Sequence, residues 1–340
     1  MINVALLCGG DSSEREISLK SARAMHSALD AQRFNVRLYD VSQVQSISTV
    51  LPLDESLLAA EEVASLRDWW QGAANAQSVA WGNLTAQLKA DETAVVLSSL
   101  HGGWGEDGTV QTLLQIADIP FAGSPARASM IAMDKRLCKA LVRESGVVAP
   151  RGVVVSSPDA PMFDGACVVK PNGGGSSMGV SFLREFDEVQ WRTAIKNALS
   201  DGSDALVEEL IEGVEVTAAV MGEGESAQAL PIVEVVPQDA TFYDYKAKYA
   251  AGGSEHICPA RLDEATTQRI QRDALAVYRA LGCRGVARSD FLVKADGMPV
   301  FLEINTLPGM TQTSLVPDAA RAAGISFSAL VENLVVGALQ

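Results

Sequence analysis

Two acidic residues face each other in the strongest β-hairpin signal of the chain. Residues 288–305 read RSDFLVKADGMPVFLEIN, and the two apolar runs flank an Asp-Gly pair that is typical of a two-residue turn. Counting outward from that turn gives the facing pairs Lys294–Pro299, Phe291–Leu302, Asp290–Glu303 and Arg288–Asn305. Because strand side chains alternate in direction, the last two pairs lie on one face of the hairpin.

That face requires a positive charge, because two carboxylates directly opposite each other repel. One solution is an ion pair with Arg288. The other is a divalent cation, since Asp290, Glu303 and the amide oxygen of Asn305 are hard ligands that suit Mg²⁺. Mg²⁺ usually completes its shell with water and substrate phosphates. The second alternative therefore predicts a phosphate-binding apparatus elsewhere in the chain.

The bulk composition limits the class of protein. The 340 residues suffice for two or three domains, and 48% hydrophobic with 20% charged residues is typical of a globular protein. A formal net charge of −15 argues against nucleic acid as a partner, because phosphate backbones require a basic surface. An anionic nucleotide would have to meet a local cluster of Lys and Arg.

The cysteines and the N-terminus predict a cytoplasmic location. The five Cys are scattered, odd in number and without metal-type spacing, as expected in a reduced compartment. The opening MINVALLCGG lacks the basic region of a secretory signal. No apolar run approaches the roughly 20 residues of a membrane span, so no membrane partner is expected.

The order of patterns along the chain predicts an α/β protein. Residues 2–8 read as a buried strand that is followed by a glycine-rich turn and a helical pattern. Residues 126–146 read as one helix that stops at Gly146, and residues 326–340 read as the final helix. A strand and turn that end near residue 123 and a break between two strands at Gly213 predict three domains, which span 1–123, 124–212 and 213–340.

A glycine-rich loop, KPNGGGSSMG at 170–179, lies between two predicted strands. Its backbone N–H groups and the Ser176 and Ser177 hydroxyls suit an anion, although no P-loop pattern is present. The alternative is a mobile surface hairpin tip. Lys170 ends the preceding apolar strand and Lys135 lies on a predicted helix, so both suit phosphate oxygens. A solvated surface lysine is the alternative for each.

Several other polar residues are candidates for ligand contacts. Glu208 and Glu215 in VEELIEGVE lie around a strand end, where they suit adenine and ribose. Glu14 and Glu16 lie at a helix N-terminus, where they either cap the helix or hold an ammonium group. His101 follows a buried strand, at the edge where open α/β sheets bind ligands. A structural histidine is the alternative.

The segment EINTLPGMTQTSL continues the acidic hairpin. Gly309 would let a backbone N–H approach a substrate oxyanion, and Ser314 would lie at a turn able to hold a carboxylate. A plain loop is the alternative.

In this order the motifs resemble the D-alanine–D-alanine ligases of the ATP-grasp superfamily. The motifs that carry the resemblance are GGDSSEREIS, HGGWGEDGTVQ, GSPARASMIAMDK, VVKPNGGGSSMGV, VEELIEGVE, FYDYKAKY, CPARL, GCRGVARSDF and EINTLPGMTQTSLVP. They run through nearly the whole chain except 42–92. The resemblance implies an α/β three-domain ATP-grasp fold. An N-terminal Rossmann-like domain precedes two α+β subdomains that hold ATP between them.

The resemblance also implies a role for each matching residue. Two Mg²⁺ (or Mn²⁺) ions would be held by Asp290, Glu303 and Asn305. The nucleotide would be bound by Lys135, Lys170 and Lys248 at its phosphates and by Glu208 and Glu215 at adenine and ribose. The D-alanine substrates would be contacted by Glu14, His101, Ser314 and Leu315. The remaining catalytic roles would fall to Arg288 and the Gly309 N–H as oxyanion stabilisers, and to Ser176 and Tyr249 as partners of Glu14 in a network closing the site.

The implied reaction is ATP-dependent ligation of two D-alanines for peptidoglycan synthesis, through a D-alanyl phosphate. The loop from 238 to 260 would be a lid that excludes water, and a homodimer is expected. Tyr249 goes with ligases that make the dipeptide. The alternatives are a ligase with D-serine, D-lactate or an L-amino acid as second substrate, a nucleotide-binding regulatory protein without catalysis, and a purely structural protein.

Overall fold

Parallel strands build the N-terminal part of the chain, as the pattern at its start predicts. This computed structural model describes residues 1–42, 60–72, 76–175, 179–200, 202–237 and 254–340. The first sheet is parallel, with the order β3-β2-β1-β4. Its strands are β1 (Ile2–Cys8), β2 (Phe34–Ser42), β3 (Ala76–Ala80) and β4 (Val95–Ser98). The helices of this part are α1 (Arg15–Ala28), α2 (Ala60–Gly72), α3 (Leu84–Ala90) and α4 (Thr109–Ile116). Two short 3-10 turns, η1 (Trp81–Asn83) and η2 (Gly103–Gly105), lie between them. Strand β1 is apolar and buried from Val4 to Cys8, as expected where helices cover both faces of a parallel sheet.

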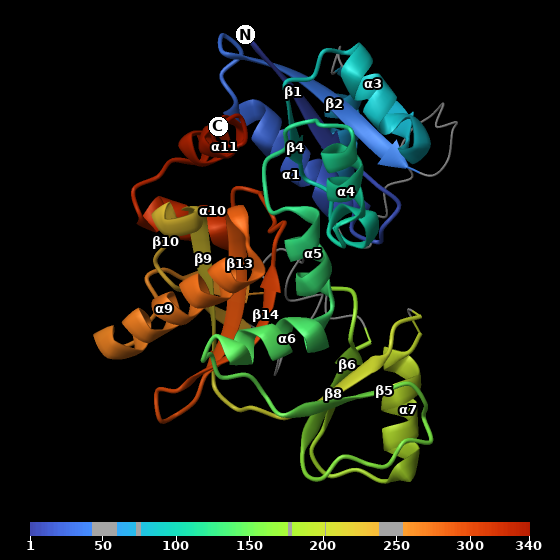
Figure 1. Ribbon diagram of the computed structural model, residues 1–340, viewed down its shortest axis with the longest axis vertical. Coiled ribbons are helices and arrows are strands. Elements are labelled where there is room, and N and C mark those ends of the chain that lie inside the picture. The colour runs from blue at the N-terminus through green and yellow to red at the C-terminus, as the bar shows by residue number, and fades with distance from the viewer. Residues whose placement is uncertain (43–59, 73–75, 176–178, 201, 238–253) are drawn as a thin grey trace.

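A second, antiparallel sheet forms a separate small unit (Figure 1). Its strands are β5 (Gly152–Val155), β6 (Cys167–Pro171), β7 (Ser181–Leu183) and β8 (Ala205–Glu209), in the order β5-β8-β6-β7, with helix α7 (Glu188–Ala198) on one face. The apolar side chains of β6, β8 and α7 form a core of their own around Trp191.

The third sheet is antiparallel and carries the acidic hairpin. Its order is β12-β11-β9-β13-β14, with β10 paired to β9. Its strands are β9 (Val214–Glu223), β10 (Gln228–Ala229), β11 (Val233–Pro237), β12 (Ser254–Ile257), β13 (Arg284–Val293) and β14 (Pro299–Asn305). The helices beside it are α5 (Ala126–Met133), α6 (Lys135–Glu144), α9 (Glu264–Leu281), α10 (Leu315–Ala322) and α11 (Phe327–Gly337). The 3-10 turn η3 (Gly224–Ser226) follows β9.

The first and third sheets share a hydrophobic core. Residues of β1, α1 and β4 pack with residues of β9, β11, α10 and α11 in one buried cluster, and α11 lies beside the first sheet (Figure 1). Helices α5 and α6 pack on the other face of the third sheet with α9. The three domain boundaries therefore remain a prediction from the sequence. The sheets of the first and third predicted domains are joined by one hydrophobic core.

The apolar C-terminal helices are core elements. No single helix in the described ranges is long and apolar enough to cross a membrane. Helices α10 and α11 pass that test only as a pair bent by 104°, and both bury apolar side chains in the shared core.

The predicted single helix over 126–146 is wrong, because the chain breaks at Asp134. This residue is extended, with φ −83° and ψ 97°, and its carboxylate accepts a hydrogen bond from the Leu137 N–H. An N-cap of this kind ends α5 and starts α6. The break places Lys135 at the first position of a helix, and Gly146 follows the end of α6 with φ 79°.

The predicted turn of the acidic hairpin is also wrong by one residue. Lys294 N–H bonds to Met298 O at 3.0 Å, so the loop has three residues and ends at Gly297 with φ 77°. Pairing next to this turn is consequently Val293–Pro299, and Phe291 faces Phe301 instead of Leu302. A register shift between Asp290 and Phe291 then restores the predicted pairs Asp290–Glu303 and Arg288–Asn305. The face that carries the acids is therefore confirmed.

Asp91 stabilises the first sheet from one end. Its carboxylate accepts hydrogen bonds from Tyr39 Oη at 2.8 Å, Gln77 Nε2 at 2.9 Å and Gln87 Nε2 at 2.8 Å, and it pairs with Arg37. Burial alone would raise the pKa of Asp91, but these hydrogen bonds outweigh it and lower the pKa to about 2. The carboxylate thus joins β2, β3 and the end of α3 as an anion.

We expect Asp91→Asn to lower the free energy of unfolding by about 1–3 kcal/mol at pH 7, because hydrogen bonds to a charged group are lost. A depressed pKa in the folded state contributes stability above the ordinary Asp value of 3.8 that is lost as the pH falls toward about 2. The difference between wild type and variant should therefore narrow between pH 5 and pH 3. Urea unfolding at both pH values measures this, and a constant difference would contradict the assignment.

Candidate active site

Asp290 lies at the centre of a buried polar group on the third sheet. Thr217 Oγ1 on β9 donates to Asp290 Oδ1 at 2.6 Å. Arg288 Nε and a terminal guanidinium nitrogen of Arg288 donate to the two Asp290 oxygens at 2.9 and 3.0 Å. The ion pair that the sequence offered as one alternative is therefore present. It neutralises Asp290 and leaves the facing Glu303 to other cations.

Glu303 and Asn305 share the face of Asp290. Lys135 Nζ lies 3.7 Å from Glu303 Oε2, and Asn305 Oδ1 accepts from the Leu307 N–H at 2.8 Å. Two carboxylates and an amide oxygen on one hairpin face form a hard donor set, and such donors suit Mg²⁺. The donor chemistry of the hairpin therefore fits a divalent cation.

Three buried charges lie on the wall beside this hairpin. Lys139 Nζ contacts both Glu208 oxygens at 2.5 Å, and Lys170 Nζ lies 2.9 Å from Glu208 Oε2. The exposed side-chain fractions are 2% for Lys139, 3% for Glu208 and 14% for Lys170. One carboxylate thus accepts from two lysines, and Lys170 is the more exposed of them and lines the cavity, so it is the lysine placed to meet a phosphate.

The pKa shifts of these groups follow from burial and mutual charge. Burial, and next the charge of Lys170, lower the pKa of Lys139 below its ordinary value. Burial would also lower the pKa of Lys170, but the charges of Glu208 and Glu303 outweigh it and raise that pKa. Burial would raise the pKa of Glu208, but the charges of Lys170 and Lys139 outweigh burial and lower this pKa. Lys170 therefore remains a cation at neutral pH.

A cavity of about 790 Å³ opens between the second and third sheets, a size that suits a small-molecule ligand. Lys135 Nζ donates to the Gly174 carbonyl oxygen at 2.6 Å and ties the glycine-rich loop to α6. Gly174 and Gly179 have φ 74° and 71°, which favour glycine. The charged predicted residues that line the cavity are Lys135, Lys170, Glu208, Glu215, Asp290 and Glu303, and apolar lining comes from Val168, Phe182, Leu210, Leu292 and Leu302.

A second group of predicted residues lies near the carboxyl ends of the first sheet. Glu14 is 5% exposed, and within the described residues its carboxylate makes no capping hydrogen bond to α1. A Cβ atom on Gly102 would lie 3.2 Å from Glu14 Oε2, so the carboxylate reaches the segment of His101. His101 Nδ1 lies 3.3 Å from Glu106 Oε1. Its Nε2 is buried and has no hydrogen-bond partner in the part of the chain described, so this atom is available to a ligand.

The segment after β14 reaches this second group. A Cβ atom on Gly309 would lie 3.2 Å from Ser314 Oγ and 3.8 Å from His101 Cε1. Thr311 N–H donates to Ser314 Oγ at 3.1 Å, and the Thr311 and Ser314 hydroxyl oxygens are 2.7 Å apart. Ser314 is followed directly by α10, whose first residue, Leu315, is buried. The structure thus brings Gly309, Ser314 and His101 together.

Four residues predicted to bind ligands lie outside the described residues, as does most of the predicted lid; they are Ser176, Ser177, Lys248 and Tyr249. Sequence reasoning missed Lys139, the direct partner of Glu208. The available signal was its position four residues after Lys135, because residues so spaced share one face of a helix. In this structure the Glu208 carboxylate accepts from two lysines, and its contact with adenine remains a prediction.

Protein-family models match most of the chain. The model described as D-ala D-ala ligase N-terminus matches residues 3–124, and the model described as D-ala D-ala ligase C-terminus matches residues 162–336. A D-alanine–D-alanine ligase of Pelotomaculum thermopropionicum is 37% identical over 352 aligned positions, which cover 100% of this chain and 97% of that protein.

Two solved structures have the same arrangement. The D-alanine–D-alanine ligase of Bacillus anthracis complexed with ATP has a TM-score of 0.74 and 28% identity. The VanG D-Ala:D-Ser ligase of Enterococcus faecalis has a TM-score of 0.77 and 26% identity, and the similarity covers 99% of both chains. The predicted ATP-grasp fold is therefore confirmed.

Proposed function

The chain belongs to the D-alanine–D-alanine ligase family, and we propose that it joins two D-alanine molecules for peptidoglycan synthesis. ATP is the co-substrate, and D-alanyl-D-alanine, ADP and phosphate are the products. The observation that carries this proposal is the acidic hairpin face, with Asp290 and Glu303, at a cavity that Lys135 and Lys170 also line.

The nucleotide occupies the cavity between the second and third sheets. Lys135 and Lys170 contact its phosphates, since both lysines line the cavity and Lys135 Nζ lies 3.7 Å from Glu303 on the acidic hairpin. Glu215 and Glu208 lie toward ribose and adenine. Lys248 adds a third phosphate contact on the basis of sequence alone.

Asp290, Glu303 and Asn305 would hold the magnesium ions. Bound there, Mg²⁺ supplies charge neutralisation of the transferring phosphoryl group. The carboxylate oxygens share one strand face, and Thr217 orients Asp290 through its hydroxyl.

The amino acids occupy the side of the first sheet. Glu14 accepts hydrogen bonds from the ammonium group of the first D-alanine, and His101 Nε2 lies beside it. A carboxylate oxygen of the first D-alanine attacks the γ-phosphorus of ATP. The bond between this phosphorus and the β,γ-bridging oxygen breaks, and ADP leaves. Arg288 and the Gly309 N–H stabilise the oxyanion of the next step. The place of Gly309 beside His101 and Ser314 supports this role for its N–H.

The second D-alanine supplies the nucleophile. Ser314 and Leu315 contact its carboxylate, and its amine attacks the acyl carbon of D-alanyl phosphate. The C–O bond to phosphate breaks, the amine loses a proton, and the dipeptide forms. Ser176 and Tyr249 close the site with Glu14, and the segment around Tyr249 excludes water from the acyl phosphate. We also propose a cytoplasmic homodimer.

The test is phosphate release from Mg-ATP with D-alanine as the sole amino acid, followed by mass analysis of the product. We expect release together with the mass of D-alanyl-D-alanine. Release only after D-serine is added would assign D-serine as the second substrate, as in the name of the VanG D-Ala:D-Ser ligase. No release with any acceptor, despite ATP binding, would overturn the ligase proposal and favour a regulatory protein.

A further inference from the structure

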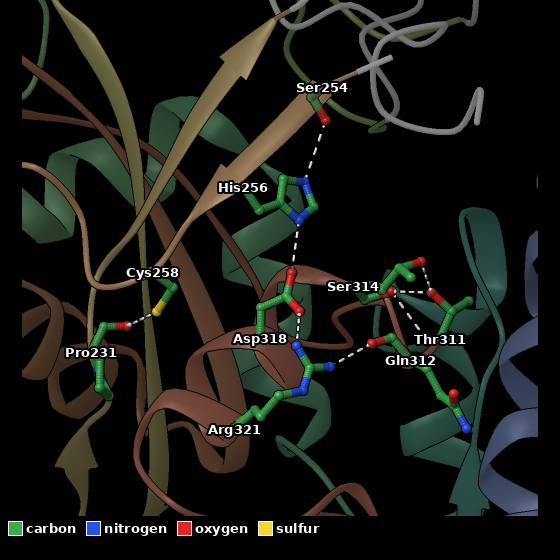
Figure 2. Close-up of polar contacts among 10 residues, drawn as sticks. Pro231, Ser254, His256, Cys258, Thr311, Gln312, Ser314, Asp318 and Arg321 are labelled. Carbon is green, nitrogen blue, oxygen red and sulfur yellow. Dashed lines mark hydrogen bonds and ion pairs between the residues drawn. The ribbon is translucent and has the colours of Figure 1, made fainter. Parts of the chain in front are cut away.

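A histidine outside the proposed contacts joins the edge of the third sheet to helix α10. His256 lies on β12, and its Nδ1 atom is 2.8 Å from Asp318 Oδ2 (Figure 2). Its Nε2 atom is 3.3 Å from Ser254 Oγ. Both partners of the contact are largely buried, with exposed side-chain fractions of 19% for His256 and 15% for Asp318. The imidazole therefore fixes one carboxylate oxygen of Asp318.

The other oxygen of Asp318 continues the network. Arg321 donates one terminal guanidinium nitrogen to Asp318 Oδ1 at 2.7 Å and the other to the Gln312 carbonyl oxygen at 2.8 Å (Figure 2). Burial would raise the pKa of Asp318, but hydrogen bonds from His256 and Arg321 outweigh it and lower the pKa. Asp318 is thus an anion that connects the imidazole to a backbone carbonyl of the preceding turn.

That turn, residues 311–314, is held from both sides. Its ends are joined by the Ser314 N–H to Thr311 O bond at 3.0 Å and by the Thr311 N–H to Ser314 Oγ bond at 3.1 Å. The Asp318 N–H also donates to Ser314 O at 3.0 Å. The network from His256 thus ends on the backbone that carries the Ser314 hydroxyl.

We infer that His256 and Asp318 are positioning residues that hold the 311–314 turn in the shape that binds the second amino acid. This inference rests on the proposed function, which places the carboxylate of that amino acid at Ser314 and Leu315. Neither His256 nor Asp318 touches the substrate. They fix the Ser314 hydroxyl through Arg321 and Gln312, so their effect falls on affinity for the second substrate and leaves nucleotide binding and the chemical step unchanged.

Two substitutions at one position separate this role from simple packing. Asn places its amide N–H₂ near the position of Nδ1, which contacts Asp318, whereas Gln places it near Nε2. His256→Asn therefore keeps the hydrogen bond to Asp318, and His256→Gln loses it. We expect His256→Gln to raise the KM of the second D-alanine about tenfold, as for loss of one hydrogen bond to a charged group. Its kcat and the KM for ATP should stay within about twofold, and His256→Asn should resemble wild type.

Initial rates over a wide range of D-alanine concentration measure the two amino-acid sites separately. The Asp91→Asn variant serves as the control for lost stability, because the contacts of Asp91 with Tyr39, Gln77, Gln87 and Arg37 share no residue with this network. A parallel fall in kcat for both His256 variants, or equal KM values for all three proteins, would overturn the positioning role.

Hydrogen–deuterium exchange tests the same inference without catalysis. In the unliganded protein, the amides of Thr311 and Ser314 should exchange faster in His256→Gln than in wild type or His256→Asn. Unchanged exchange in His256→Gln would refute the positioning role even if the ligase assay succeeds. Faster exchange together with no D-alanine turnover by wild type would uphold the positioning of the turn and overturn the proposed substrate.

Discussion

Asp290→Asn is expected to lower kcat at least about a thousandfold, equivalent to about 4 kcal/mol in the activation free energy. The change keeps the shape of the side chain and its hydrogen bond from Thr217. It removes the negative charge that the proposed magnesium site requires and that Arg288 pairs with. Phosphate release from Mg-ATP with saturating D-alanine measures the effect.

The matched control for this variant is Asp296→Asn at the tip of the same hairpin. Asp296 has a 60% exposed side chain, pairs with its neighbour Lys294 across 3.3 Å and accepts a hydrogen bond from the Met298 N–H at 3.0 Å, which an Asn side-chain oxygen can keep. An exposed pair of this kind contributes little, so activity should stay within about twofold. If Asp290→Asn retained more than a tenth of wild-type activity, Asp290 would serve only as the ion-pair partner of Arg288.

Glu208→Gln is expected to destabilise the protein by about 3–5 kcal/mol, because a buried ammonium group loses its counter-charge. Lys139 has a 2% exposed side chain and contacts both Glu208 oxygens, so water does not replace the lost carboxylate. The same change should weaken ATP binding, since Lys170 also loses its partner. Urea unfolding and nucleotide titration measure the two effects.

The pH dependence of Glu208→Gln has a defined sign. Burial lowers the pKa of Lys139 in the folded protein below its ordinary value of 10.5. A lysine of this kind costs stability below its folded pKa, and the cost falls as the pH rises from that pKa toward 10.5. Because Glu208 raises the pKa of Lys139, which is about 7 in wild type, the variant should gain stability relative to wild type as the pH rises from about 5 to about 7. A decrease over this range would contradict the assignment.

A double variant and a control variant test the assignment of Glu208. Removing both charges in Lys139→Met with Glu208→Gln should restore part of the lost stability, since no ammonium group then remains fully buried there. Glu209→Gln changes the next residue of β8, whose partner Arg151 has an 80% exposed side chain. That control should cost less than about 1 kcal/mol.

The sequence predicted the face of the hairpin that carries the acids, although it missed both the length of the turn and a register shift in the strands. The two offsets cancel at Asp290. The Asp-Gly pair favoured a two-residue turn, whereas the turn has three residues and Gly297 in the left-handed region. A register shift next to Asp290 removes the resulting offset. Alternation of side chains identifies a face of a strand, but no local pattern locates a bulge, which depends on packing against β9.

The helix boundaries were predicted less well, for physical reasons that are local. The apolar period continues through Asp134, so the cap that separates α5 from α6 is hidden within an unbroken pattern. Helix α10 was not predicted, and Pro317 lies in its first turn. Pro in the first turn of a helix loses no hydrogen bond, since those N–H groups have no partner within the helix.

The partners of the site residues were the least predictable part. Lys139 and Glu208 are 69 residues apart in the sequence, and His256 and Asp318 are 62 apart. Both contacts depend on how α6 meets the second sheet and how α10 meets the edge of the third. The resemblance to a ligase family identified residues that would touch substrates, and it carried no information about the side chains that hold those residues.

The distribution of the hydrophobic cores has a mechanical consequence. The first and third sheets share one core, whereas the second sheet has its own around Trp191. Glu14 and Ser314 therefore lie on one packed unit, here called the base, which consists of the first and third sheets with their shared core. The packing of this core fixes the separation of the two residues. The nucleotide cavity instead lies between that base and the second sheet, which packs around a separate core. A change in the width of this cavity would expose neither core, so ATP can enter and ADP can leave while the geometry for peptide-bond formation is preserved.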